Sequence, residues 1–291
     1  MSRQPTARSN PDPLIPADQL ADLMRDGTGR RDPVVVLDVR WTLAGSDPDS
    51  YLTAHIRGAR FVDLDRDLAG PAGLGGRHPL PDPVDLQAAL RAVGIDDDST
   101  VVVYDGGSGL ASARAWWLLR WSGLPDVRVL DGGLAAWLAV DDRPTAAGPG
   151  ATPQPGTVTV KPGGMPVVEV DRAAELAASG ALIDARAAAR YRGEIEPLDP
   201  VAGHIPGSVN LPIGDLLTAG GTFRSPAELR AAFAGLGFAA TDAQSVAASC
   251  GSGITACQLI LAAEVAGLEL ALYPGSYSQW CALGRPVAVG A

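Results

Sequence analysis

The same series of short motifs occurs twice along this chain of 291 residues, in the same order. Residues 35–40 (Val-Val-Leu-Asp-Val-Arg) return as 181–186 (Ala-Leu-Ile-Asp-Ala-Arg), and the His-Ile-x-Gly turn at His55 returns at His204. Further pairs of segments complete the series: 83–94 with 226–237, 101–109 with 245–253, 130–133 with 273–276, and 142–144 with 284–286. Ordered self-similarity of this extent predicts two copies of one domain.

Short apolar segments alternate with helical patterns inside each copy. Residues 33–38 and 100–104 are rich in valine and apolar on both faces, as in buried parallel strands. Residues 84–93 place leucine and valine side chains on one face of a helix. This alternation predicts an α/β fold with two tandem domains, each a mostly parallel sheet flanked by helices.

Residues 145–166 differ in composition from both flanking segments, because proline and glycine are frequent there. A segment of this kind is typical of a semi-rigid linker. We therefore predict an N-terminal domain over residues 1–144, a linker over 145–166 and a C-terminal domain over 167–291.

The net charge of the chain is −10, which argues against nucleic acid and against an anionic membrane surface as partners. Charged residues, glycine or proline interrupt every apolar run before it reaches the length of a membrane span. Residues 1–6 contain no apolar segment of the kind found in a signal peptide. Three cysteines are too few for a disulfide framework, so we predict a reducing, cytoplasmic setting.

One cysteine, Cys250, follows the apolar segment 245–248 and precedes a helical pattern over 257–264. A strand, a turn with glycines and a helix would place this thiol at a helix N-terminus, where free N–H groups and the macrodipole favour an anion. A thiolate forms more easily there than on a free cysteine. The corresponding loop of the first copy, residues 105–109, contains no thiol. We therefore predict that only the second copy is catalytic.

The remaining cysteines and the histidines favour structural roles. Cys250 could itself be an inert core thiol, but the glycines beside it favour the reactive interpretation. Cys257 and Cys281 are predicted to be structural, with a redox role for Cys281 left open. Three histidines and three cysteines lack the spacing of metal ligands, so no metal is predicted. Residues 105–109 lack the lysine or acidic partner of a nucleotide-binding loop, so no cofactor is predicted.

The paired motifs resemble those of the two-domain sulfurtransferases of the rhodanese family. The Asp-x-Arg sequences, the His-Ile-x-Gly turns and the cysteine loop carry this likeness from Val34 to Pro286. Residues 250–256, Cys-Gly-Ser-Gly-Ile-Thr-Ala, are similar to the loop Cys-Gly-Ser-Gly-Val-Thr-Ala of 3-mercaptopyruvate sulfurtransferases. Thiosulfate-preferring rhodaneses carry arginine and lysine at the positions of Gly251 and Ser252. The resemblance implies two rhodanese-like domains, the first without the catalytic cysteine.

The resemblance also implies a reaction. Cys250 would take a sulfane sulfur from a donor, become a persulfide and pass the sulfur to a thiol or to cyanide. Backbone N–H groups of residues 251–256 would hold the persulfide anion. The small residues 251 and 253 would let the backbone approach the sulfur and make the turn. The substrate-binding positions expected in this loop are Gly251, Gly253, Ile254 and Thr255.

In the mercaptopyruvate enzymes, the loop serine is assigned to a proton relay with a histidine and an aspartate of the first domain. Carried over to this chain, the resemblance implies a relay of Ser252 and His55, with Asp47 or Asp49 as the third member. The equivalent positions of His55 and His204 in the two copies favour a structural turn role for both histidines instead. Both interpretations of His55 stay open at this point.

In that subfamily, arginines of the second domain hold the substrate carboxylate. A guanidinium suits a carboxylate because it donates two parallel hydrogen bonds. The resemblance assigns this role to Arg190. The second arginine of the family follows an acidic residue and a proline, but here Leu198 follows residues 196–197, so Arg186 or Arg192 would have to replace it. Arg186 is also half of a repeated Asp-x-Arg sequence, which predicts a structural ion pair.

The predicted reaction is transfer of a sulfane sulfur from 3-mercaptopyruvate to a thiol acceptor, such as a thioredoxin-like protein, or to cyanide. Thiosulfate is the alternative donor, but this dianion would benefit from positive charge beside the thiol, which Gly251 and Ser252 do not supply. A cysteine-dependent phosphatase is disfavoured, because Ala256 stands where such enzymes carry an arginine. A non-catalytic sulfur-binding module is disfavoured by the intact thiol in its glycine-containing loop.

Overall fold

A five-stranded parallel sheet forms the centre of the first unit. The structure is a computed structural model that describes residues 11–25, 34–242 and 244–290. The strands of the first sheet lie in the order β1-β8-β7-β2-β6. Their bounds are Leu14–Ile15 (β1), Asp126–Leu130 (β8), Thr100–Tyr104 (β7), Val35–Asp38 (β2) and Arg60–Phe61 (β6). β2 is buried along its whole length and β7 except at its first residue, as the apolar runs predict.

The second unit repeats this arrangement. Its parallel strands lie in the order β11-β10-β12-β13. Val167 forms a parallel bridge to Leu272, in the place that β1 holds beside β8. The bounds of the strands are Val209–Asn210 (β11), Leu182–Asp184 (β10), Ala247–Ser249 (β12) and Ala271–Leu272 (β13). The predicted α/β fold with two similar parallel sheets is therefore confirmed.

Short antiparallel pairs lie outside the two sheets. β3 (Trp41–Thr42) pairs with β4 (Gly45–Ser46), and β5 (His55–Ile56) pairs with β9 (Thr145–Ala146). His204 forms an antiparallel bridge to Ala288 in the second unit, as His55 does to Ala146 in the first. The repeated histidines therefore occupy the same structural position in both units.

Helices flank each sheet. Those of the first unit are Ala17–Arg25 (α1), Pro48–Thr53 (α2), Leu64–Asp67 (α3), Pro83–Ala92 (α4), Leu110–Trp121 (α5) and Gly133–Leu138 (α6). Those of the second unit are Val170–Ala178 (α7), Ala188–Tyr191 (α8), Pro226–Gly235 (α9), Ile254–Val265 (α10) and Ser276–Ala282 (α11), with a 3₁₀ turn η1 at Ile213–Leu216. Equivalent caps begin α4 and α9: each has proline as its first residue, after an Asp82 or Ser225 side chain that accepts a backbone N–H bond.

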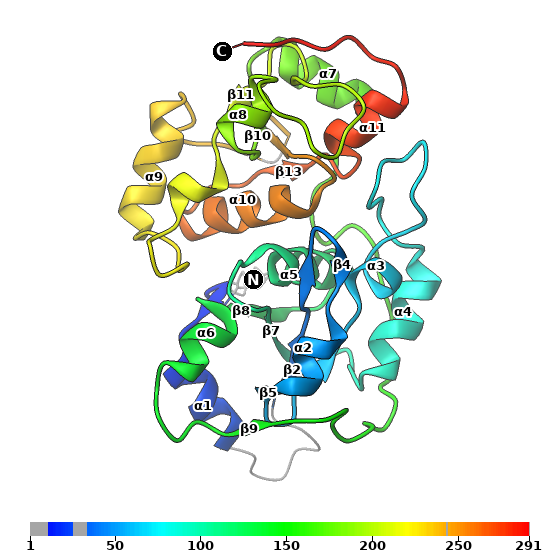
Figure 1. Ribbon diagram of the computed structural model, residues 1–291, viewed down its shortest axis with the longest axis vertical. Helices are drawn as coiled ribbons and strands as arrows, with labels where there is room; N and C mark the ends of the chain where they lie inside the picture. The colour runs from blue at the N-terminus through cyan, green and yellow to red at the C-terminus, as the bar shows by residue number, and fades with distance from the viewer. Residues whose placement is uncertain (1–10, 26–33, 243, 291) are drawn as a thin grey trace, which may run out of the picture.

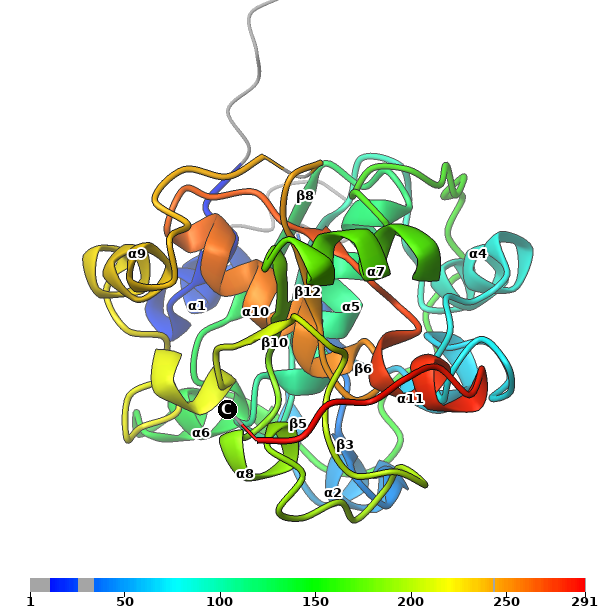
Figure 2. The same ribbon diagram turned by 90° about the horizontal axis from the view of Figure 1, so that it is seen from above.

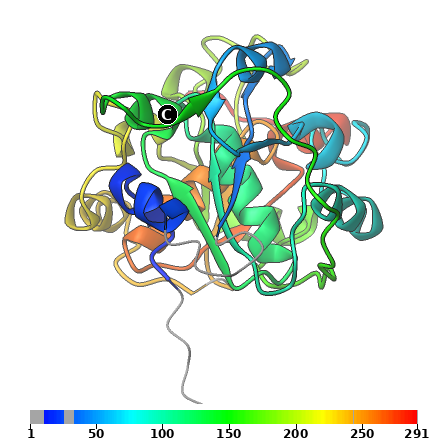
Figure 3. The same ribbon diagram turned by 90° about the horizontal axis from the view of Figure 1, so that it is seen from below.

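The two units lie one above the other and largely cover each other when viewed along their common axis (Figure 1, Figure 2, Figure 3). Helices α5 and α10 lie between the two sheets and pack against each other (Figure 1). Both helices are apolar around most of their circumference, because each faces its own sheet on one side and the other helix on the opposite side.

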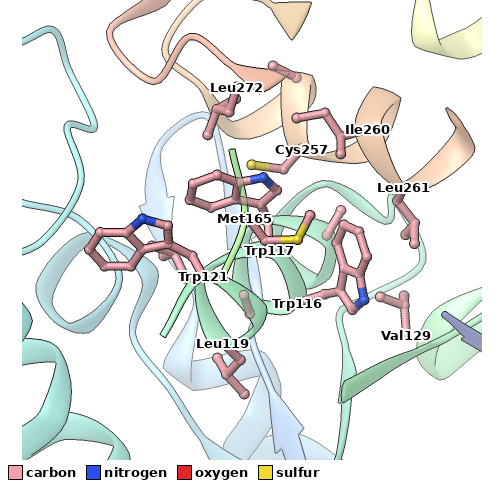
Figure 4. Close-up of a cluster of buried hydrophobic side chains, with 14 of the residues drawn as sticks. Trp116, Trp117, Leu119, Trp121, Val129, Met165, Cys257, Ile260, Leu261 and Leu272 are labelled. Carbon is pink, nitrogen blue, oxygen red and sulfur yellow. The ribbon is translucent and has the colours of Figure 1, made fainter. Parts of the chain in front are cut away.

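One buried apolar cluster extends across both units. Trp116 and Trp117 of α5 lie close to Cys257, Ile260 and Leu261 of α10 in this cluster (Figure 4). The cluster also includes side chains from the central strands of both sheets. Cys250 and the start of α10, which follows its loop, are therefore held by a core that both units share.

Residues 145–166 follow the surface of the first unit. Gly156 donates to the carbonyl of Arg91 at 2.8 Å, Val158 to Ile95 at 3.1 Å, and Gly164 to Trp121 at 3.0 Å. Apart from β9 this segment contains no helix or strand in the structure. It is an extended connection attached along its length by backbone hydrogen bonds.

A buried arginine connects the units near the start of α10. Arg114 of α5 is fully buried, and its Nη2 donates to the carbonyls of His78 at 3.1 Å and Pro79 at 3.2 Å. Its Nη1 donates to the carbonyl of Gly253 at 3.4 Å. Arg114 thus holds the loop around residue 78 against the turn that follows Cys250.

Within the described part of the chain, no helix has the length and apolar character needed to cross a bilayer. The expectation that residues 1–6 are not a signal peptide concerns a segment outside the described residues.

Candidate active site

Cys250 directly follows β12, at the carboxyl end of a central parallel strand, where ligands commonly bind in open α/β sheets. The side chain is buried, with 1% of its surface exposed. Gly253 donates its backbone N–H to Cys250 Sγ at 3.2 Å, and the Cys250 N–H donates to Ser276 Oγ at 3.1 Å. The sulfur is therefore already a hydrogen-bond acceptor inside its own loop.

The glycine at position 253 is required by the turn. Gly253 is the N-cap of α10 with φ of 81°, a left-handed conformation that L side chains rarely adopt. A Cβ at this position would lie 2.4 Å from the carbonyl oxygen of Pro274. The turn leads directly into α10, whose first N–H groups have no acceptor within the helix and so favour an anion at the loop. Of the cradle that the sequence predicts around the sulfur, the structure shows the contact from the Gly253 N–H.

The corresponding loop of the first unit shows what such a cradle binds. Asp105 follows β7 as Cys250 follows β12, and its carboxylate is buried. Oδ1 accepts the N–H groups of Gly107 at 2.8 Å and Gly109 at 3.0 Å. Oδ2 accepts the N–H of Ser112 at 3.3 Å and its hydroxyl at 3.2 Å. The Asp105 carboxylate occupies the cradle of the first unit, whereas the second unit presents a thiol.

Ser252 lies in the Cys250 loop and contacts a histidine of the first unit. His78 Nδ1 is 2.8 Å from Ser252 Oγ, and His78 Nε2 is 3.4 Å from Asp65 Oδ1. Asp65 belongs to α3, and His78 lies in the loop before α4. A carboxylate, an imidazole and a hydroxyl therefore contact one another in that order, and the hydroxyl belongs to the Cys250 loop.

The predicted partnership of Ser252 with His55 is wrong. His55 lies in β5, is buried, and stacks on Tyr51 with ring centroids 4.0 Å apart, while its Nδ1 is 2.9 Å from the Tyr51 carbonyl oxygen. His204 repeats this geometry with Tyr191 at 3.8 Å. These histidines stabilise equivalent turns, which is the structural role that their symmetry favours.

Asp47 and Asp49, the proposed third members of the relay, belong to α2 rather than to the site. Asp47 is the N-cap of α2 and accepts the Ser50 N–H at 3.1 Å. Hydrogen bonds from Ser50 hold the pKa of the Asp47 carboxyl below its usual range. Asp49 lies in the first turn of the same helix. The carboxylate that contacts His78 is Asp65 instead.

The surroundings of His78 keep its imidazole neutral. Burial lowers the pKa of His78, and the positive charges of Arg114 and Arg77 lower it further, against the opposing effect of Asp65. A neutral imidazole can accept a proton through Ser252, since one ring nitrogen is then free to act as an acceptor. A cavity of about 470 Å³ on the first-unit side is lined by Asp65, Arg77 and His78 among other residues.

Two guanidinium groups approach the Cys250 loop, one from each unit. A Cβ placed on Gly251 would lie 3.0 Å from Arg77 Nη2 and 3.6 Å from Arg190 Nη1. Gly251 is not among the glycines with positive φ, so its lack of a side chain provides room for the two guanidinium groups rather than a turn. Arg190, to which the resemblance assigns the substrate carboxylate, therefore lies beside the Cys250 loop, together with Arg77, which sequence reasoning missed.

The predicted substitutes for a second arginine lie elsewhere. Arg186 is buried and pairs with Asp184 at 2.7 Å and with Glu196 at 3.4 Å, and its guanidinium covers the Tyr277 ring. Burial opposes its charge, but these carboxylates outweigh that effect and raise the pKa of Arg186. Arg192 pairs with Glu194 at the surface. Arg186 is thus a structural ion pair, as its Asp-x-Arg sequence predicts, and the structure does not place it in the candidate substrate site.

The position of Arg77 is fixed by a short chain of hydrogen bonds. Its backbone N–H donates to Ser278 Oγ at 3.1 Å, and the Ser278 N–H donates to the carbonyl of Gly251 at 2.8 Å. The loop of the first unit is thereby connected through α11 to the residue after Cys250. Hydrogen bonds thus join the backbone of Arg77 to the Cys250 loop.

The remaining loop residues and cysteines have distinct environments. Ile254 is buried in the shared core, and Thr255 is half-buried in the first turn of α10. Cys257 is fully buried, donates to the Gly253 carbonyl at 3.1 Å, and has its pKa raised to about 12 by burial. Cys281 is half-buried, and burial raises its pKa. Neither thiol is favoured as a thiolate.

The described residues contain no group of three or more potential metal ligands.

A family model for the rhodanese-like domain matches residues 16–140 and 169–283, one match in each unit. The chain belongs to the rhodanese family. It is 44% identical over 295 residues to a Pseudomonas aeruginosa protein provisionally named 3-mercaptopyruvate sulfurtransferase, covering 95% of this chain and 98% of that protein. It is 41% identical to a Mycobacterium tuberculosis protein provisionally named thiosulfate sulfurtransferase SseB, covering 95% and 97%.

A solved rhodanese structure supports the same assignment. The 3-mercaptopyruvate sulfurtransferase SseA from Escherichia coli superposes with a TM-score of 0.76 at 31% identity, covering 92% of this chain and all of that one. The chain is therefore a sulfurtransferase with two rhodanese domains, as the sequence predicts. Relatives of both donor classes are almost equally similar, so their names do not decide the donor of this protein.

His78 rather than His55 is expected to support turnover. Replacing His78 with Asn should lower kcat on the order of a hundredfold, because general acid–base transfer contributes at least that much. Replacing His55 with Asn should lower the free energy of unfolding but leave kcat of the folded enzyme nearly unchanged. Because the pKa of His78 is lowered, the acid limb of the pH–rate profile should lie below about pH 6.5, the usual histidine pKa. A kinetic defect confined to His55→Asn would contradict the assignment.

Asp105 is expected to stabilise the first rhodanese domain. Its replacement by alanine leaves buried and part-buried N–H and hydroxyl donors without an acceptor. This change should lower the free energy of unfolding by about 3 kcal/mol, measured by denaturant titration. Asp98→Ala, which removes an exposed carboxylate before β7, is the control and should change it by less than about 0.5 kcal/mol. Equal effects of both substitutions would argue against the cradle interpretation.

Proposed function

We propose that this rhodanese moves a sulfane sulfur from 3-mercaptopyruvate to a thiol or to cyanide through a persulfide on Cys250. The Cys250 thiolate attacks the donor sulfur, a new S–S bond forms, and the C–S bond of the donor breaks. The electron pair of that bond stays on carbon, which takes up the proton of the donor thiol to give pyruvate. The terminal sulfur then passes to the acceptor, and the Cys250 thiolate is restored.

The observation that carries the donor assignment is the contact between His78 and Ser252. Release of pyruvate requires a proton to leave the donor thiol and reach carbon, and a hydroxyl bound to a neutral imidazole can move that proton. Release of sulfite from thiosulfate requires no such transfer. Asp65, beside the other ring nitrogen, would orient the imidazole and stabilise its charged form.

The donor carboxylate is assigned to the arginines above Gly251. Arg190 and Arg77 lie within reach of a small molecule whose sulfur contacts Cys250. Backbone N–H groups of residues 251–256 would hold the terminal sulfur of the persulfide, as the N–H groups of the first domain hold the Asp105 carboxylate. We further propose a thioredoxin-like protein as the thiol acceptor and a cytoplasmic setting, to which the three free thiols are suited.

Thiosulfate is the second candidate donor. Two guanidinium groups close to the thiol are the feature that favours it, since they could bind both charged oxygens of this dianion. Thiosulfate would need the same Cys250 persulfide but would leave the Ser252–His78 contact without a function. The two donors can therefore be separated by experiment.

Steady-state assays with both donors and one acceptor test this proposal. We expect kcat/KM for 3-mercaptopyruvate to exceed that for thiosulfate by at least about tenfold. Intact-mass measurement after donor treatment should find one added sulfur atom, located on Cys250. Cys250→Ser should abolish transfer from either donor, whereas Cys257→Ser should retain most of it, because Cys257 is a buried thiol of the core. A higher kcat/KM for thiosulfate would overturn the donor assignment.

A further inference from the structure

One buried carboxylate lies between the two guanidinium groups above the Cys250 loop. Asp199 Oδ1 accepts a charged hydrogen bond from Arg77 Nη1, and its Oδ2 lies 3.3 Å from Arg190 Nη2. The Asp199 side chain is 1% exposed, whereas those of Arg77 and Arg190 are 29% and 17% exposed. The arginines can therefore contact a small molecule, while Asp199 is covered by them.

The position of Asp199 is built into the chain. Glu196 accepts the N–H groups of Leu198 and Asp199, each at 3.0 Å, and its carboxylate pairs with Arg190 at 2.6 Å. These bonds fold residues 196–199 into a tight turn that directs Asp199 toward Arg77 of the other domain. The carboxylate is thus a fixed part of the site rather than a mobile surface group.

Charge in this cluster is balanced. The ion pairs contain three arginines and three carboxylates, contributed by Arg77, Arg186, Arg190, Asp184, Glu196 and Asp199. The six charges cancel, so the cluster offers directional guanidinium donors to a bound molecule but carries no net charge of its own. The balance of charges costs a monoanion little binding free energy, because hydrogen bonds hold its single carboxylate. It costs a dianion more, since the second charge of the dianion has no counter-charge.

We propose that Asp199 determines donor specificity by cancelling one guanidinium charge, so that the site accepts a monoanionic sulfur donor and discriminates against a dianionic one. This inference rests on the proposed function, because it assumes that the donor anion binds beside Cys250. Asp199 does not touch the reacting atoms; it acts through Arg77 and Arg190.

Removing the charge of Asp199 tests the proposal. Asp199→Asn keeps the size of the side chain and one carbonyl oxygen but leaves the cluster with one excess positive charge. The ratio of kcat/KM for thiosulfate to kcat/KM for 3-mercaptopyruvate should rise by about tenfold. Sulfate, a dianionic inhibitor, should gain potency more than pyruvate, a monoanionic one. Glu194→Gln, which removes an equal charge from the surface pair with Arg192, should leave both ratios unchanged.

Two further variants distinguish an effect of the Asp199 charge from a structural role of Asp199. Arg77→Gln should weaken inhibition by sulfate more than inhibition by pyruvate, because it gives the cluster one excess negative charge. The double variant Arg77→Gln/Asp199→Asn is neutral again, and its donor ratio should return toward that of the unaltered protein. A structural role of Asp199 would not produce this compensation.

The outcomes distinguish this inference from the proposed function. If the unaltered protein forms no persulfide on Cys250 with either donor, the proposed function fails. If the persulfide forms but the donor ratio is the same in folded Asp199→Asn, the specificity role of Asp199 is wrong. Should Asp199→Asn not fold, equal loss of sulfate and pyruvate inhibition in Arg77→Gln would overturn the inference instead.

Discussion

An anion held by backbone N–H groups, where a parallel strand passes into a helix, is the interaction on which this site depends. In the first domain, the carboxylate of Asp105 accepts these N–H groups. The second domain has the same strand, turn and helix, but a sulfur atom occupies the position and already accepts one N–H bond. The same arrangement of strand, turn and helix therefore holds a carboxylate in the first domain and the Cys250 sulfur in the second.

The second requirement is the contact between the domains. Cys250, Ser252 and Arg190 belong to one domain, whereas His78 and Arg77 belong to the other. Packing of α5 on α10 fixes the two domains, and Arg114 and Ser278 attach the loop of residues 68–79 to the cysteine loop. A polar group that is buried between the domains without a hydrogen-bond partner costs free energy. Backbone carbonyls and hydroxyls supply these partners for Arg114 and for the loop.

Sequence reasoning predicted the repeat, the parallel sheets and the cysteine loop, because each depends on local pattern and glycine chemistry. It named His55 for the relay and did not consider His78, since the contact of His78 with Ser252 joins residues 174 positions apart in the chain. A signal was present: His55 and His204 are equivalent in the two copies, and His78 is the one histidine without a counterpart. Arg77 and Asp199 were harder to find, because they pair across the domain interface and no local sequence pattern indicates this pairing.

A crystal structure of the protein treated with 3-mercaptopyruvate would locate the transferred sulfur. We expect a second sulfur atom bonded to Cys250 Sγ and within hydrogen-bond distance of backbone N–H groups of residues 251–256, in the place that the Asp105 carboxylate has in the first domain. A sulfur that points away from these groups, or a modified cysteine other than Cys250, would contradict it.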